Sequence, residues 1–139
     1  MKFLMTPIFV MALLAQPAFA LDPEFGDDSG NWASDGTCDD PRFAGPGMAE
    51  PPLLFEDVNR DASDCATAFY AGRIVWRGVS TDGTIDFGDD SSEWSNDGEC
   101  DDLRFVGEAM TTTELLEEDI MTDATDCRTG YEFEALFLR

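Results

Sequence analysis

A nine-residue stretch around a cysteine occurs twice in this chain and decides its fold. It reads Asp35-Gly36-Thr37-Cys38-Asp39-Asp40-Pro41-Arg42-Phe43 and, 62 positions later, Asp97-Gly98-Glu99-Cys100-Asp101-Asp102-Leu103-Arg104-Phe105. Outward from it, the same offset aligns 25–29 with 87–91 and 61–65 with 123–127, so that about 25 of about 53 aligned positions are identical. Because internal repetition sets the architecture of a chain, the sequence predicts two tandem copies of one acidic module.

The N-terminus predicts export. Lys2 precedes a mostly apolar run over 3–15 and the small residues Ala18 and Ala20, which is the pattern of a secretory signal peptide. A retained membrane anchor is the weaker alternative, because Asp22 and Glu24 give no stop-transfer pattern. We therefore expect a signal peptide at 1–20, a first module at 21–79 and a second at 80–139, in a periplasmic or secreted protein with no membrane insertion after cleavage.

The charge of the chain restricts its partners and its chemistry. The formal net charge is -22, there is no histidine, and Lys2 is the only lysine. Such a surface repels phosphate backbones and attracts cations or basic proteins, so we expect no nucleic acid and an exported, basic protein as partner. Without histidine or a retained lysine, the usual general bases are missing, and we do not expect an enzyme. The alternatives are a carboxylate-based hydrolase and a purely structural envelope protein.

The four cysteines predict one disulfide in each module. Four cysteines allow three pairings, but only Cys38 with Cys65 and Cys100 with Cys127 can each descend from a single-module ancestor. Closing a loop of nearly thirty residues contributes roughly 3 to 4 kcal/mol in an oxidising compartment. A zinc site is the weaker alternative, because the Cys-x-x-Cys pairs of zinc modules are missing.

The local patterns predict a small α+β fold, disulfide-stabilised and loop-rich, with short helices and one or two short strands per module. Ordered loops are expected over 25–48. Helices are expected over 53–60 and 115–122, with a Thr111 to Glu114 capping box before the latter. A second helix starts at Asp61 or Asp64 and ends at Gly72, where a left-handed cap suits glycine. Strands are expected over 73–77 and 84–87. The strand edges at 74–76 and 136–138 could pair into one sheet or could equally remain apart.

Four isolated aromatics in the predicted loops are expected to act as core anchors, two in each module. Trp32 and Phe43 lie in an otherwise largely polar stretch of the first copy. Trp94 and Phe105 occupy the same positions in the second copy. Single aromatics in glycine-rich loops of a small domain more often fill the core than bind a ligand. A sugar-stacking role for the tryptophans is the alternative.

Acidic residues recur beside the cysteines and predict a calcium site in each module. A bridge between the cysteines would gather four carboxylates per copy, and calcium accepts six to eight oxygen ligands in flexible geometry. The candidate ligands are Asp39, Asp40, Asp61 and Asp64, and Asp101, Asp102, Asp123 and Asp126. The competing interpretation makes these acids helix caps and partners of Arg42 and Arg104. The EF-hand template fails, because an arginine falls where its bidentate acid belongs.

The repeated motif resembles a short Asp/Cys-rich motif that recurs in secreted proteobacterial proteins, sometimes appended to other domains. The resemblance covers both modules and implies export but no activity. The acids beside the cysteines are also faintly similar to the calcium-binding LDL-receptor class A module, which uses six cysteines in fewer residues, so its sites are not carried over. The sequence as a whole predicts an exported acidic interaction or cation-binding module, with calcium as its only expected cofactor.

Overall fold

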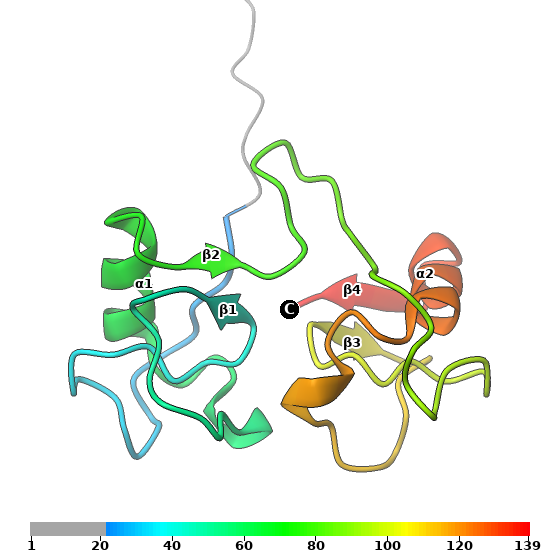
Figure 1. Ribbon diagram of the computed structural model, residues 1–139, viewed down its shortest axis with the longest axis horizontal. Helices are drawn as coiled ribbons and strands as arrows, with labels where there is room; N and C mark the ends of the chain where they lie inside the picture. The colour runs from blue at the N-terminus through cyan, green and yellow to red at the C-terminus, as the bar shows by residue number, and fades with distance from the viewer. Residues whose placement is uncertain (1–21) are drawn as a thin grey trace, which may run out of the picture.

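The computed structural model describes residues 22–139, and the predicted signal peptide lies outside the described residues. Its elements are β1 (Phe43–Ala44), η1 (Phe55–Asp57), α1 (Ala62–Tyr70), β2 (Val75–Trp76), β3 (Phe105–Gly107), η2 (Glu117–Asp119), α2 (Ala124–Glu132) and β4 (Leu136–Leu138). The first half (22–79) and the second half (80–139) carry the same order of elements and lie side by side (Figure 1). Short helices, short strands and long loops make the small α+β fold that the sequence predicts.

Each half contains its own two-stranded antiparallel sheet. β1 pairs with β2, so that Phe43 lies opposite Trp76, and β3 pairs with β4, so that Phe105 lies opposite Leu138. The two halves therefore do not share one sheet in the described part of the chain. The strand predicted over 84–87 is wrong. The connecting segment turns back on itself there and leaves only a single bridge between Val79 and Ile85.

The helix predicted over 53–60 is also wrong, because only the 3₁₀ turn η1 forms there. Leu54 before η1 is extended, and Val58 after it (φ −59°, ψ 124°) is not helical. Asn59 is left-handed (φ 61°) and donates its backbone N–H to the Asp40 carboxylate at 2.9 Å. A continuous helix would withdraw this donor from a buried acid. In the second half the Thr111 capping box fails too, because helical turns begin only at η2.

The second predicted helix is confirmed as α1, which begins after Asp61. Gly72 is left-handed (φ 69°), and the following residue Arg73 donates its N–H to Ala68 O at 2.9 Å, which closes the end of the helix as predicted. No helix among residues 22–139 is long and apolar enough to cross a membrane.

The core forms around the disulfides and continues between the halves. Cys38 and Cys65 pack with Phe43 and Trp76 in the first half, and an equivalent cluster surrounds Phe105 in the second. Leu138 packs against both clusters. A third cluster joins Val58 of the first half to Leu103, Leu115 and Ile120 of the second. The two halves therefore pack on each other through apolar side chains.

The aromatic anchors divide into two classes. Phe43 and Phe105 are fully buried, as predicted. Trp32 is 57% exposed and Trp94 is 51% exposed, so the prediction that these tryptophans fill the core is wrong. The reason is that other rings occupy the core, where Phe25 stacks on Phe43 at 5.6 Å and Phe87 stacks on Phe105 at the same distance.

Candidate functional site

Two disulfides hold the repeated loop against the start of each longer helix. Cys38 is bonded to Cys65 and Cys100 to Cys127, which are the pairings predicted from the sequence. All four cysteines are buried. Each bridge crosses 27 residues and brings the acids beside the first cysteine next to the acids that open α1 or α2.

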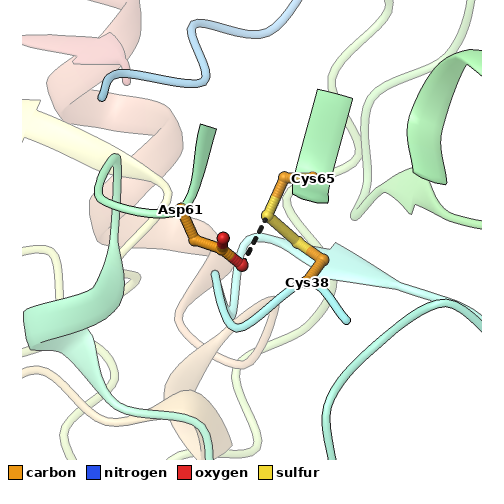
Figure 2. Close-up of side chains that lie close together, drawn as sticks. All are labelled: Cys38, Asp61 and Cys65. Carbon is orange, nitrogen blue, oxygen red and sulfur yellow. Dashed lines mark hydrogen bonds between the residues drawn. A yellow bond between two sulfur atoms is a disulfide. The ribbon is translucent and has the colours of Figure 1, made fainter. Parts of the chain in front are cut away.

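Asp61 lies at the centre of this arrangement. Its Oδ2 accepts the backbone N–H of Asp39 at 2.8 Å. The same oxygen lies 3.6 Å from Cys65 Sγ (Figure 2). The disulfide sulfur carries no hydrogen, so the second approach is a van der Waals contact. Asp61 is 2% exposed, and its Oδ1 is buried without a hydrogen-bond partner. Asp123 repeats all of this, with Asp101 N–H at 2.9 Å and an unpartnered Oδ1.

The Asp61 carboxylate can accept a hydrogen bond from the cysteine loop because another residue caps α1. Asp61 occupies the position before α1 but makes no side-chain cap bond. Asp28 accepts the Ser63 N–H at 2.8 Å and the Ser63 hydroxyl at 2.6 Å instead. These bonds hold the pKa of Asp28 below its usual value. In the second half Asp90 binds Thr125 in the same way, so the second acid of the pair near the start of each copy serves as a helix cap.

The carboxylates of this site have raised pKa values. Burial raises the pKa of Asp61 to about 7, and the nearby Asp64, Asp39 and Asp35 carboxylates add to the effect. Burial raises the pKa of Asp39 to about 6, with further contributions from Asp35, Asp57 and Asp64. The pKa values of Asp101 and Asp123 rise to about 6 for the same reasons. The common cause is that acids are withdrawn from water beside other acids.

The remaining acid of the predicted site lies at its edge. Asp64 accepts the Gly36 N–H at 2.9 Å, and Asp126 accepts the Gly98 N–H at 3.0 Å. Two pairs near the site were missed by the ligand prediction, namely Asp35 with Asp97 and Asp57 with Asp119. Both pairs are identical between the two copies, which is the signal that could have found them.

Asp40 and Asp102 do not belong to the site, which corrects the predicted ligand set. Arg42 and Asp40 are both buried, and Arg42 Nε donates to both Asp40 oxygens at 3.0 Å. The Asp40 carboxylate also accepts two backbone N–H groups, from Arg42 and Asn59. Asp102 has the same partners in Arg104 and Met121. These oxygens are saturated by donors, so a cation would have to displace a buried guanidinium to reach them.

The arginine of the second half also holds the connection between the halves. Arg104 Nη1 donates to Arg77 O and to Asp86 O, both at 3.0 Å. The corresponding Arg42 Nη1 is buried without a partner. Arg104 therefore stabilises the connecting segment in addition to neutralising Asp102.

The geometry favours protons or hard cations and disfavours thiolate metal sites. Within residues 22–139, the only groups of three that offer ligand atoms within 4.8 Å of one another are Cys38, Asp61, Cys65 and Cys100, Asp123, Cys127. Their sulfurs are bonded to each other and do not act as thiolate ligands. What remains in each half is two buried carboxylate oxygens that have no hydrogen-bond partner: Asp39 Oδ2 and Asp61 Oδ1 in the first half, and Asp101 Oδ2 and Asp123 Oδ1 in the second. Unpaired buried oxygens of this kind are stabilised by a proton or a cation.

Comparison with known proteins adds no further constraint on this site. No protein-family model matches the chain, and neither a curated protein nor a solved structure gives a match.

Proposed function

We propose that this protein is an exported, acidic binding protein made of two tandem modules, each of which holds one calcium ion beside its disulfide. The observation that carries the proposal is the pair of buried carboxylate oxygens in each half that have no hydrogen-bond partner. An isolated carboxylate costs several kcal/mol to bury unless it is paired or coordinates a metal. A bound cation would offset this cost.

The recurrence of the contacts supports a duplicated site. The hydrogen bonds of Asp28, Asp40, Asp61 and Asp64 each have a counterpart 62 positions later, with the same atoms and similar distances. The unpartnered oxygens recur at the same offset. Duplication of the module accounts for the recurrence, and both copies retain a feature that is costly to bury.

Calcium fits the available ligands better than a transition metal does. The site offers carboxylate oxygens and no imidazole or thiolate, and such hard oxygen ligands suit calcium and magnesium. Calcium accepts backbone carbonyls and water as well as carboxylates in flexible geometry, whereas magnesium requires a near-ideal octahedron. Each half offers two buried carboxylate oxygens without a partner, so backbone carbonyls and water would have to supply the other ligands of each ion. Asp39 and Asp61 anchor the first ion, and Asp101 and Asp123 anchor the second.

Isothermal titration calorimetry of the oxidised protein with calcium chloride tests the proposal. We expect two calcium ions per chain in the wild type, one in Asp61→Asn, one in Asp123→Asn and none in the double variant. Glu132→Gln removes the same charge from an exposed position on α2 and is the matched control. Equal uptake by the wild type and the double variant, or equal heats with magnesium at matched ionic strength, would refute the calcium site.

A further inference from the structure

Two hollows lie next to each other between the halves of the molecule. The first has a volume of about 610 Å³ and the second of about 630 Å³. Both are lined by Leu53, Leu54, Leu116 and Glu117, so they form one continuous depression, which we call the interlobe groove. Phe55 and Val106 extend its wall on one side. Neither half alone supplies this surface.

The interlobe groove exposes large apolar side chains. Leu54 is 43% exposed and Leu116 is 39% exposed, and Phe55 and Val106 are exposed to a similar degree. Phe137 lies directly opposite Val106 in the sheet of the second half and is 57% exposed, so the apolar surface continues onto β4. A contiguous exposed apolar surface rimmed by polar residues is typical of an interaction site.

The rim of the groove is acidic. Glu56, Glu114 and Glu118 line it and are exposed. Glu117 forms an ion pair with Arg77 at 2.6 Å, so these two side chains contribute no net charge to the rim. The remaining cation is Arg139, whose guanidinium is 5.1 Å from the Phe55 ring and donates to Phe105 O. The local balance is therefore negative, in a chain whose formal net charge is -22.

We propose that the interlobe groove docks a basic, amphipathic segment of a partner protein. Its leucines or other apolar residues would cover Leu54, Phe55 and Leu116, and its lysines or arginines would face the acidic rim. A second copy of this chain is a poor occupant, because two strongly negative proteins repel each other. Two adjoining hollows also suit an extended or helical segment better than a single small molecule. This inference goes beyond calcium binding and does not depend on it.

The test uses a synthetic peptide of leucines and lysines in amphipathic helical order, with fluorescein at one end, and measures fluorescence anisotropy at 150 mM NaCl. We expect Leu54→Ser and Leu116→Ser together to weaken binding at least tenfold, about 1.4 kcal/mol. Val75→Ser changes an apolar residue that is 62% exposed outside the groove, and we expect it to weaken binding less than twofold. A second peptide with serine in place of leucine should bind at least tenfold more weakly to the wild type.

Three outcomes would overturn the proposal. Equal affinity of the wild type and the double serine variant would mean that the peptide does not bind in the groove. Each single variant is measured as well, and near-ultraviolet circular dichroism verifies that each variant is folded. If the wild type binds the serine peptide as tightly as the leucine peptide, the binding is due to charge attraction alone. Sedimentation of the free protein as a dimer that Leu116→Ser dissociates would assign the groove to a second copy. All measurements are made both in EDTA and in calcium. The result for the groove can therefore be interpreted even if the protein does not bind calcium.

Discussion

Asp61 accepts the backbone N–H of Asp39 through one carboxylate oxygen, at 2.8 Å, while its other oxygen is buried without a partner. The first contact ties the repeated cysteine loop to the start of α1. The second oxygen carries an unfavourable desolvation cost in the absence of a cation. The Asp61 carboxylate therefore has two opposite effects: one oxygen stabilises the loop through its hydrogen bond, and the other destabilises the metal-free protein. Replacing Asp61 should for this reason change the stability differently with and without a cation.

Asp61→Asn should stabilise the calcium-free protein and abolish the response of the first half to calcium. Each unit by which the pKa of a buried acid is raised costs about 1.4 kcal/mol at high pH, and the unpaired amide of asparagine takes back part of that gain. We expect the free energy of unfolding at pH 8 in EDTA to rise by about 1 to 2 kcal/mol. Chemical denaturation in EDTA and in millimolar calcium measures both effects.

The control for this experiment is Glu132→Gln, which removes one negative charge at an exposed position. It should change the stability in EDTA and in calcium by the same small amount. If Asp61→Asn destabilises the protein in EDTA as well as in calcium, its carboxylate is held by interactions that do not need a cation, and the destabilising role of Asp61 is wrong.

The calcium-free protein should lose stability as the pH rises from about 4 to about 7. The folded-state pKa is about 7 for Asp61 and about 6 for Asp39, Asp101 and Asp123, against 3.8 in the unfolded chain. The folded protein therefore binds more protons than the unfolded chain in this window, and stability is highest below it. Thermal unfolding in EDTA at half-unit pH steps measures the slope. A rise in stability across the window would contradict the raised pKa values.

Calcium should reverse this slope, because its ligands must be deprotonated. The gain in melting temperature on adding calcium is expected to be larger at pH 8 than at pH 5, where most of the site carboxylates retain a proton. A gain that is independent of pH would point to binding at exposed acids with ordinary pKa values.

Arg104→Lys should destabilise the protein more than Arg42→Lys does. Both arginines are fully buried against an aspartate, and lysine keeps the charge but loses the forked geometry. Arg104 Nη1 also donates to Arg77 O and Asp86 O, whereas Arg42 Nη1 has no partner. We expect a loss of about 2 to 4 kcal/mol for Arg42→Lys and about 1 kcal/mol more for Arg104→Lys. Arg42 Nη2 donates to Glu24 O at 2.8 Å. Equal losses in urea denaturation would therefore mean that the two bonds from Arg104 to the connecting segment contribute no more than that single bond.

The two halves should unfold in one cooperative transition. Leu138 packs against the core clusters of both halves, and Val58 packs with Leu103 across the boundary. Leu138 is partly buried, so Leu138→Ala should lower the stability of the whole protein by about 1 to 2 kcal/mol, less than the loss of a fully buried leucine. Differential scanning calorimetry checks this through the ratio of calorimetric to van't Hoff enthalpy. Two resolved transitions in the wild type would show that the halves are energetically independent.

Several features follow from the sequence because they depend on the duplication or on local chemistry. The offset between the copies predicts the pairings Cys38 with Cys65 and Cys100 with Cys127, and the structure contains both. The start of α1 after Asp61 and the left-handed Gly72 at its end follow from the residues at those positions alone. The buried position of Phe43 agrees with its prediction as an isolated aromatic in a polar loop, although the same argument fails for Trp32.

Tertiary structure alone decided which of two adjacent acids is paired with an arginine. Asp39 and Asp40 follow the same cysteine. The Asp40 carboxylate accepts hydrogen bonds from Arg42 and Asn59, whereas Asp39 donates its backbone N–H to Asp61 and its own Oδ2 has no partner. It also decided that Trp32 stays outside and that only η1 forms where a longer helix was predicted. The physical reason is the same in each case. The burial of a side chain and its hydrogen-bond partners depend on segments that are distant in the sequence and meet only in the folded protein. A local sequence pattern does not specify which of these segments will be in contact.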